Sequence, residues 1–388
     1  MTTTAGELYG RETEAEQERR TSYLELFFDL VFVFAITQVT TLVVDDPTAG
    51  GFARGALVLW LVWWAWGGFA WMTNAISIES RGVRVAFLAV TLGCFFVALA
   101  VPDAYGDDVL WFALPYVAIR VAQVALYVWG LRLDPAHQAA IRQLAPWFLV
   151  APLVVLAGAF LDGGARVAAW LVAVAIDVGG ALNVSGAGFR VSAAHFAERY
   201  GLFVIISLGE SIVAIGVGAA GLERDATFAA AVTVAFSGVA LLWWAYFDFL
   251  ALGAQRTLAR TPIERRGPVA RDIYSLLHFG FVLGIILYAV GAKKTLEHPA
   301  DPLSAGGRWA LALGVGFYLL ASVLGRLRAI RAVAWERAAG AVAAVGLALL
   351  LRDVDAIWLL TAVAGLLGAV IAVESVRLRE LRRGLVGG

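Results

Sequence analysis

The chain lacks most of the residues on which common cofactors depend. It has one cysteine, Cys94, among 388 residues, which excludes an internal disulfide and a multi-cysteine metal site. Of its four histidines only His278 lies well inside an apolar run, which disfavours a bis-histidine haem. No lysine lies inside such a run, so a retinal Schiff base has no residue on which to form. We therefore expect no cofactor.

Motifs of common enzymes are missing as well. The sequence has no His-Glu-x-x-His zinc motif, no nucleophile elbow and no phosphate-binding glycine loop with its lysine. Asp177 and Asp248 lack the Gly-x-Gly-Asp context of an intramembrane aspartyl protease. The formal net charge is zero, so no overall field attracts nucleic acid. These absences disfavour an enzyme of these classes and a protein that binds nucleic acid.

What the chain has in excess is apolar sequence. Hydrophobic residues make up 61% of it and charged residues 15%, which is typical of an integral membrane protein. The first twenty residues are polar and of mixed charge, so we expect no signal peptide. Twelve apolar runs are long enough to span a bilayer, at residues 22–44, 52–74, 85–101, 111–131, 144–160, 167–182, 200–220, 226–250, 273–290, 309–324, 334–351 and 356–376. The predicted fold is an all-α, polytopic transmembrane helix bundle of about twelve helices.

Basic residues predict the orientation, because short cytoplasmic loops retain Lys and Arg. Arg54 and Arg337 lie at the ends of apolar runs and are assigned to the adjoining loops, while Arg120 lies inside a run. The two termini and the even-numbered loops then hold about three times as many Lys and Arg residues as the odd-numbered loops. We expect a multi-pass protein with both termini in the cytoplasm.

The two halves of the chain resemble each other in short segments. Trp63-Trp64 recurs as Trp243-Trp244. Ala175-Ile-Asp177 then recurs as Ala372-Val-Glu374, in the same order along the chain. These matches predict a parallel repeat of two six-helix halves. The expected parts are a cytoplasmic tail at 1–21, the first half at 22–182, a connecting segment at 183–199, the second half at 200–376 and a cytoplasmic tail at 377–388.

The first apolar run carries two carboxylates, Glu25 and Asp29. Each costs about 2.5–3.5 kcal/mol in hydrocarbon, so we expect it to face another helix, a partner charge or a water-filled cavity. The two residues are four apart and therefore share one helical face, to which Thr40 returns about three turns later. Alternatively, the side chain of Glu25 reaches the membrane surface.

Further ionisable residues lie inside later runs: Arg120, Asp177, Glu210, Asp248, His278 and Glu374. Such charges mark ion pathways or buried ion pairs. Arg120 is expected to pair with a carboxylate, with Asp29 and Glu210 as the candidates, either to fix helix packing or to bind a substrate or anion. Glu210 is either a protonated acid bonded to a neighbour such as Ser207 or a proton or cation site. His278 is either a hydrogen-bonded core histidine or a proton relay.

A second polar group precedes the seventh apolar run. His195, Glu198 and Arg199 have spacings of three and four residues, so they share one helical face. We predict that they lie at the cytoplasmic mouth. They form either a solvated ion-pair cluster at the membrane surface or part of a gate.

Tryptophans crowd the second apolar run: Trp60, Trp63, Trp64, Trp66 and Trp71. Aromatic packing and anchoring at the membrane interface account for such a cluster. The alternative is an aromatic wall for an organic ligand. The sequence leaves both open.

Two sequence blocks resemble a known family. The first is Glu25-Leu-Phe-Phe-Asp-Leu-Val-Phe-Val-Phe-Ala35, and the second is His195-Phe-Ala-Glu-Arg-Tyr-Gly-Leu-Phe-Val-Ile-Ile-Ser-Leu-Gly-Glu-Ser211. Both are similar to the bacterial low temperature requirement A family, which implies a multi-pass protein of the bacterial inner membrane. That name describes a growth phenotype and implies no mechanism. A weaker resemblance joins Phe28-Asp29-Leu-Val-Phe32 to the Phe-Ser-Asp first-helix motif of lysosomal-type potassium channels, with Phe28 in place of the serine.

The intramembrane charges favour a proton-linked transporter or a cation channel. The predicted ion pathway comprises Asp29, Glu210, Glu25, Arg120, Asp177, Asp248 and His278, with His195, Glu198 and Arg199 at its mouth. The alternatives are a membrane enzyme or cofactor protein that handles a lipid or quinone, and a membrane sensor or assembly factor whose ion pairs are only structural. The expected partners are the lipid bilayer and protons or monovalent cations, and a homodimer is compatible with the sequence.

Overall fold

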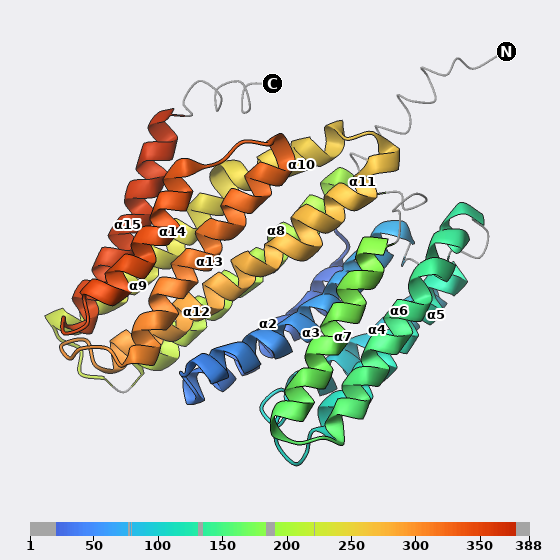
Figure 1. The fold of residues 1–388 in the computed structure, drawn as a ribbon, viewed down its shortest axis with the longest axis horizontal. Helices are drawn as coiled ribbons and strands as arrows, with labels where there is room; N and C mark the ends of the chain where they lie inside the picture. The colour runs from blue at the N-terminus through green and yellow to red at the C-terminus, as the bar shows by residue number, and fades with distance from the viewer. Residues whose placement is uncertain are drawn as a thin grey trace. The chain divides into compact units, whose positions relative to one another are not determined.

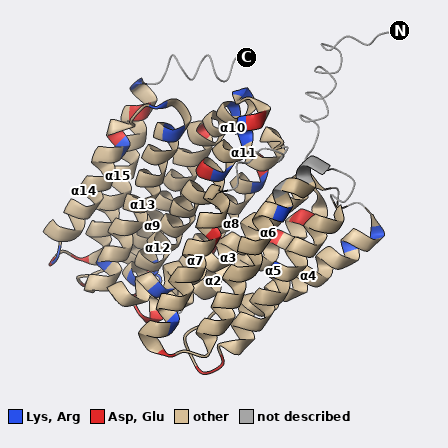
Figure 2. Cartoon of the chain, turned by 45° about the vertical axis from the view of Figure 1, so that its right-hand side comes forward, with Lys and Arg blue, Asp and Glu red and all other residues tan. Residues whose placement is uncertain are grey.

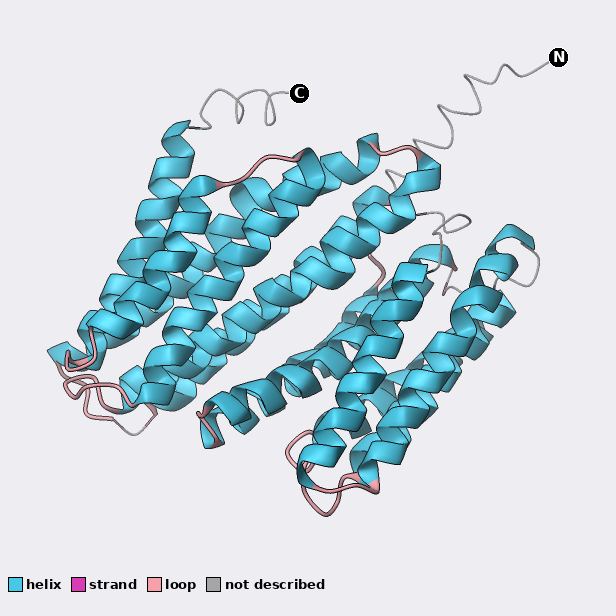
Figure 3. Cartoon of the chain, viewed as in Figure 1, coloured by secondary structure: helices cyan, strands magenta, loops and turns pink. Residues whose placement is uncertain are grey.

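The computed structural model describes residues 21–76, 78, 80–130, 135–183, 191–220 and 222–377. The elements in these ranges are helices joined by short loops (Figure 3). Residues 1–20 and 378–388 of the predicted tails, and residues 184–190 of the predicted connecting segment, lie outside the described residues.

The helices follow one another along the chain as labelled in Figure 1. Up to the middle of the chain they are α2 (Tyr23–Asp45), α3 (Ala49–Ala75), α4 (Arg81–Leu99), α5 (Leu110–Gly130), α6 (Pro135–Ala159), α7 (Gly163–Asn183) and α8 (Ala193–Ala219). They continue as α9 (Ala226–Ala245), the π-helical turn η1 (Tyr246–Leu250), α10 (Ala251–Arg260), α11 (Ile263–Ala270), the π-helical turn η2 (Arg271–Leu277), α12 (His278–Glu297), α13 (Ala305–Ile330), α14 (Trp335–Leu350) and α15 (Ala356–Arg377).

Each of the twelve predicted spans overlaps a helix, which confirms the all-α, membrane-spanning fold class. Within the described part of the chain, 11 helices are long and apolar enough to cross a membrane. The remaining predicted span, at 334–351, corresponds to α14, which has 16 residues. A helix that crosses the hydrocarbon core needs about 20 residues, so α14 is short for that role.

Helical structure extends beyond the predicted spans in several places. The predicted loop between residues 250 and 273 is largely helical, as α10 and α11. Helix α6 begins at Pro135 instead of residue 144, and α8 begins at Ala193 instead of residue 200. Hydropathy detects the residues that prefer lipid, and it does not detect polar turns that continue the same helix.

Side-chain caps fix several helix starts. The side-chain oxygens of Ser80, Asp225 and Ser304 each accept a hydrogen bond from the backbone N–H three residues further on. Helix α13 ends at Ile330 and is capped by Arg331, whose φ of 53° is left-handed. These local signals separate α4, α9 and α13 from the connections around them.

The chain forms two compact units that are each discontinuous in sequence. Unit 1 comprises Met1–Ala35, Trp60–Phe203 and Ala254–Ser275. Unit 2 comprises Ile36–Leu59, Val204–Gly253 and Leu276–Gly388. The six-plus-six repeat and the predicted boundaries of its halves stay predictions.

Aromatic rings fill the centre of unit 1. The ring centroid of Trp66 in α3 lies 4.9 Å from that of Tyr200 and 4.3 Å from that of Phe203, both in α8. Phe32 of α2 lies 6.3 Å from Phe203. Aromatic pairs contribute about 0.5–1.5 kcal/mol each beyond their buried area. This core holds α2, α3 and α8 together at the level where their charged residues lie.

Glycines bring α12 and α13 into close contact in unit 2. A Cβ at Gly284 would lie 2.6 Å from the carbonyl oxygen of Gly314, and a Cβ at Gly314 would lie 2.6 Å from the backbone nitrogen of Tyr288. Any side chain at these glycines would therefore separate the two helices. The Tyr288 hydroxyl donates to the carbonyl of Ala235 at 3.0 Å and so ties α9 to the same pair.

The helices carry most of their charged residues near their ends, as Figure 2 shows. At the connection between α2 and α3, Asp46 accepts hydrogen bonds from the Thr48 hydroxyl, at 2.7 Å, and from the Arg54 guanidinium. The Thr48 hydrogen bond, followed by the charge of Arg54, lowers the pKa of Asp46. Such partly exposed pairs contribute little to stability.

Candidate functional site

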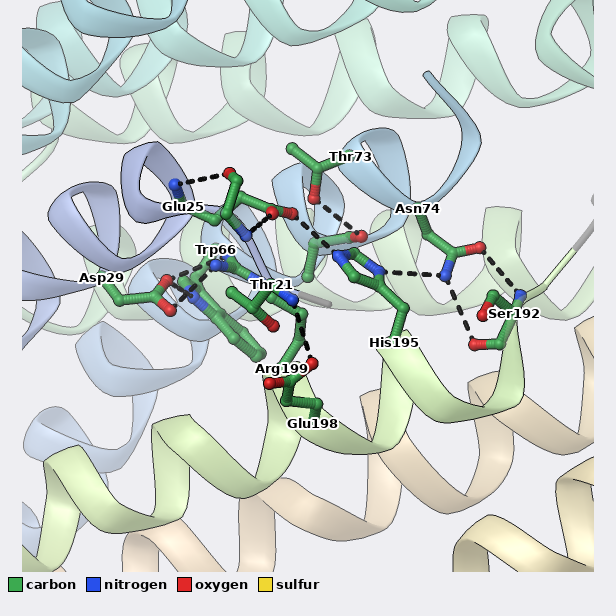
Figure 4. A network of polar contacts seen from close by, with 12 residues as sticks. Thr21, Glu25, Asp29, Trp66, Thr73, Asn74, Ser192, His195, Glu198 and Arg199 are labelled. Atoms are coloured by element: carbon green, nitrogen blue, oxygen red, sulfur yellow. Dashed lines mark hydrogen bonds and ion pairs between the residues drawn. The ribbon is translucent and has the colours of Figure 1, made fainter. Parts of the chain in front are cut away.

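The start of α8 brings two basic residues to two acids of α2. His195 and Arg199 lie one helical turn apart on α8, and Glu25 and Asp29 have the same spacing on α2. The equal spacing lets them pair in register, His195 with Glu25 and Arg199 with Asp29 (Figure 4). All four side chains are buried within unit 1. These four residues are termed the paired-charge cluster.

Asp29 accepts three hydrogen bonds. Arg199 donates from Nη1 to Oδ2 and from Nη2 to Oδ1, both at 2.9 Å, and Trp66 of α3 donates from Nε1 to Oδ1 at 2.8 Å. This bidentate geometry is the strong form of an arginine–carboxylate pair. It fixes the position of Asp29 against both α3 and α8.

The pair of Glu25 and His195 is held in a different way. His195 Nε2 lies 3.1 Å from Glu25 Oε1, and His195 Nδ1 lies 3.3 Å from Asn74 Nδ2. The backbone N–H of Ser192 donates to Asn74 Oδ1 at 3.2 Å, so the N–H side of the amide faces the imidazole. In this arrangement Nδ1 accepts, and Nε2 carries the proton that points at Glu25. The imidazole is therefore neutral.

The Glu25–His195 pair places an acid and a base in hydrogen-bond contact. Histidine is the side chain that ordinarily changes its charge near neutral pH. Transfer of a proton from Nε2 to Oε1 requires that the ring first take up a second proton at Nδ1, because loss of the Nε2 proton from the neutral ring would leave an imidazolate.

The predicted cytoplasmic mouth is divided between two environments. Glu198 is exposed and accepts a hydrogen bond from the backbone N–H of Thr21 at 2.9 Å. His195 and Arg199 are 1% and 0% exposed. The alternative of a solvated surface cluster is therefore wrong for these two residues, because their partners on α2 are themselves buried.

Arg120 of α5 pairs with Asp177 of α7, with 2.6 Å between Nη2 and Oδ1 and both side chains buried. The prediction that Arg120 pairs with a carboxylate is confirmed, but the expected partners Asp29 and Glu210 are wrong. The guanidinium also lies over the ring of Phe148, 4.6 Å from its centroid. Nε and Nη1 of Arg120 have no hydrogen-bond partner among the residues that the structure describes.

Glu210 lies on α8 in unit 2, where it is 2% exposed. The hydroxyl of Thr37 in α2 donates a hydrogen bond to its Oε2. Lys293 of α12 packs against Gly218, two turns further along α8. A buried acid with a neutral hydroxyl partner is compatible with either predicted alternative, a protonated acid or a proton or cation site.

His278 begins α12 and is 3% exposed. Its Nε2 lies 2.8 Å from the hydroxyl of Tyr246 in η1, and the same π-helical turn carries the partly buried Asp248. This environment matches the hydrogen-bonded core histidine of the two alternatives, and a relay role stays a prediction. Short π-helical segments are frequent at functional sites.

Arg337 is buried, although its position at the end of an apolar run predicted a loop residue. It donates to Glu374 Oε2 from Nε at 3.0 Å and from Nη2 at 2.5 Å. Nη1 donates to Ser322 Oγ at 2.8 Å, and Nη2 also donates to the carbonyl of Ala245 at 3.1 Å. Every guanidinium nitrogen of Arg337 thus has a partner, and the pair joins α13, α14 and α15 within unit 2.

Neutral residues complete the paired-charge cluster, and we did not expect them as site residues. Trp66 binds Asp29, while Asn74 and Ser192 fix the orientation of His195. The one signal for Asn74 is its place as the last residue of a predicted span, where an amide is common without any function. Within the described ranges, no group of three or more His, Cys, Asp or Glu side chains could hold a metal ion.

Comparison with known proteins places these residues in a family context. The family model described as Bacterial low temperature requirement A protein (LtrA) matches residues 20–372 of the chain. The uncharacterized protein RA0937 of Rhizobium meliloti (strain 1021) is 30% identical over 298 residues, which cover 74% of this chain and 72% of that protein. No solved structure matches the chain. The family match includes the paired-charge cluster.

Proposed function

This chain belongs to the bacterial low temperature requirement A family, and within that family we propose that it is a proton-linked transporter or cation channel of the inner membrane. The observation that carries the proposal is the Glu25–His195 pair, a buried acid and a buried base in hydrogen-bond contact in a protein of many apolar helices. Ionisable groups inside membrane spans are costly, and proton relays are one of the functions that retain them.

His195 is the proposed site of proton exchange. The neutral imidazole accepts from Asn74 at Nδ1 and donates to Glu25 at Nε2. A proton added at Nδ1 would face the amide N–H, so Asn74 has to turn its oxygen toward the ring. That turn breaks the hydrogen bond from the backbone of Ser192. The protonation state of His195 is therefore linked to the start of α8.

Asp29 and Arg199 provide a charge pair one turn from the exchange site. A proton on His195 adds a positive charge near the Arg199 guanidinium, and like charges inside a low-dielectric region repel strongly. The added charge disfavours a second cation nearby. Under this proposal, a proton on His195 and a cation bound nearby weaken each other's binding.

Further buried or partly buried polar groups complete the proposed pathway. Glu210 with its Thr37 hydroxyl partner, and His278 with its Tyr246 partner, are buried polar groups of unit 2. Asp248 lies in the π-helical turn beside Tyr246. Arg120 and Asp177 form the corresponding buried charges in unit 1.

Flux measurements in sealed proteoliposomes test the proposal. Asp29→Asn and Glu210→Gln should each abolish pH-dependent ion flux, while the purified variants stay folded and monodisperse. Asp301→Asn is the matched control, because that carboxylate is 76% exposed, and it should retain wild-type flux. Full flux in both pathway variants would overturn the proposal in favour of a sensor or assembly factor.

We also propose that both termini lie in the cytoplasm. The support is the excess of Lys and Arg in the even-numbered loops. Gly106, in the loop between α4 and α5, and Arg265, in α11, are exposed and lie on opposite sides of the predicted topology. In a Cys94→Ala background, a cysteine at Gly106 should react with an impermeant maleimide from outside, and a cysteine at Arg265 only after the membrane is opened. Equal labelling of both in sealed cells would contradict this orientation.

A further inference from the structure

A cavity in unit 1 lies against the tryptophan-rich side of α3. It holds about 680 Å³ of space, counting its open side, and its walls include Trp63, Trp64, Trp71, Tyr127 and Phe148. A concave site lined mainly by aromatic and apolar side chains is typical of small-molecule binding. The aromatic walls offer flat apolar surfaces on which a ring can stack.

The lining carries no unbalanced charge. Arg271 of η2 lines the cavity, but it donates to Asp272 Oδ1 from Nε at 2.8 Å and lies 2.7 Å from the same oxygen at Nη2. Its Nη1 donates to the carbonyl of Ala181 at 2.9 Å. Ser275, the other polar residue from η2, accepts from Trp71 Nε1 at 2.8 Å. The cavity therefore suits an uncharged ligand better than an anion or a cation.

Hydrogen-bonding groups without partners lie behind the cavity wall. Gln123 and Arg120 precede Tyr127 on α5 by four and seven residues, so the three share one helical face. Both amide atoms of Gln123, and Nε and Nη1 of Arg120, lack a hydrogen-bond partner in the described part of the chain, although both residues are 0% exposed. Unpaired polar groups are costly in a membrane span, so such a cluster indicates a place where a ligand or water binds.

Each of these two residues touches a residue that lines the cavity. A Cβ at Gly68 would lie 1.8 Å from Gln123 Nε2, so the amide rests directly on the bare backbone of Gly68. The Arg120 guanidinium lies over the ring of Phe148. A modest movement of the Phe148 side chain would therefore bring the unpaired donors of α5 into the cavity.

We propose that this cavity binds an uncharged amphiphile whose flat ring carries carbonyl oxygens, a ligand of the quinone class. The ring would stack between the indole walls and Phe148, and its carbonyl oxygens would accept hydrogen bonds from Gln123 and Arg120. Its apolar tail would extend into the bilayer. This site is distinct from the paired-charge cluster, and the proposal does not rest on proton-linked transport.

Decylubiquinone is the probe for the first test, with the purified full-length protein in detergent. A quinone stacked against indole rings quenches their fluorescence, so we expect saturable quenching of tryptophan emission. Decanol has the same chain length and no ring, and it should neither quench nor displace the probe. Absence of saturable quenching would overturn the proposal. Displacement of the probe by decanol at equal concentration would also overturn it, and would indicate a site for acyl chains alone.

Gln123→Leu separates ligand binding from packing. Removal of an unpaired buried amide should raise the melting temperature, whereas loss of one hydrogen bond to the ligand should weaken probe binding about tenfold. Gly365→Ala in α15 is the control, since its Cβ would meet no atom within 4 Å and the residue does not line the cavity, and its affinity should match the wild type. Phe148→Leu removes a stacking face and provides an independent second variant. Wild-type affinity in both Gln123→Leu and Phe148→Leu would contradict the proposed site.

Discussion

Two buried arginine–carboxylate pairs differ in how completely they are hydrogen-bonded. Arg337 in unit 2 uses all of its guanidinium nitrogens, with Glu374, Ser322 and the carbonyl of Ala245 as acceptors. Arg120 in unit 1 makes one hydrogen bond to Asp177, and its other two nitrogens have no partner among the described residues. Both pairs are almost fully buried.

The number of hydrogen-bonded guanidinium nitrogens separates an ion pair that only stabilises the fold from one that can also bind a ligand. A fully bonded buried ion pair fixes the helices that supply it and has no capacity for a ligand. A partly bonded pair beside an aromatic cavity has donors that a ligand can use. In this protein the first kind joins α13, α14 and α15, and the second kind lies next to the cavity at α3.

The largest stability loss is expected for Arg337→Leu. The substitution removes four hydrogen bonds and leaves Glu374 buried without its partner, which should destabilise the protein by about 3–5 kcal/mol. Unfolding by SDS titration in mixed micelles measures this change. The double variant Arg337→Leu/Glu374→Gln should recover only part of the loss, because the other acceptors of Arg337 stay unbonded. Full recovery would show that the charge of Glu374 alone matters.

Arg120→Leu should be less damaging, and a second substitution should rescue it more completely. The single variant leaves Asp177 unpaired, whereas Arg120→Leu/Asp177→Asn leaves one lost hydrogen bond of about 1 kcal/mol. The same SDS titration compares the two double variants. If Asp177→Asn rescues no better than Glu374→Gln does, the contrast between the two pairs is wrong.

Asn74→Leu tests the hydrogen bonds that orient His195. It removes contacts to the imidazole and to the backbone of Ser192, and we expect a loss of about 1–2 kcal/mol. The imidazole should then accept a proton more readily, because no N–H faces Nδ1. Nuclear magnetic resonance of the ¹⁵N-labelled imidazole at several pH values measures its protonation. A titration identical to that of the wild type would exclude a role for Asn74.

The smallest effect is expected at the partly exposed Asp46–Arg54 pair. The lowered pKa of Asp46 means that folding favours its ionised form, so its contribution to stability is present at neutral pH and is lost as the pH falls through the acidic range. Asp46→Asn should therefore change the melting temperature little at neutral pH and not at all in acid. A large loss at neutral pH would show that exposure is a poor guide to the cost of removing a charge here.

The fold was predictable because lipid imposes a simple requirement on sequence. Every predicted span overlaps a helix, since long apolar runs have few alternatives in a bilayer. The helices α10 and α11 were not predicted, because they contain residues that hydropathy assigns to loops. His195 and Arg199 were expected to share a helical face, but hydropathy did not show that their turns continue the span at 200–220.

The charge partners were harder to predict than the charges themselves. Glu25 and Asp29 were identified by their cost in hydrocarbon, but their partners His195 and Arg199 lie 170 residues away. No spacing rule connects residues on different helices. Arg337 was misplaced for the same reason, because its burial depends on Glu374 in α15 and not on its own sequence neighbours.

The most direct test of the central claim is the pH profile of ion flux in proteoliposomes that contain His195→Gln. Glutamine keeps a hydrogen bond to Glu25 and cannot change its charge. The wild-type protein should show flux that varies over the pH range in which histidine ordinarily titrates, and His195→Gln should remove that variation without unfolding the protein. His298→Gln, at a histidine that is 75% exposed, should keep the wild-type profile. An unchanged profile in His195→Gln would contradict proton exchange at the Glu25–His195 pair.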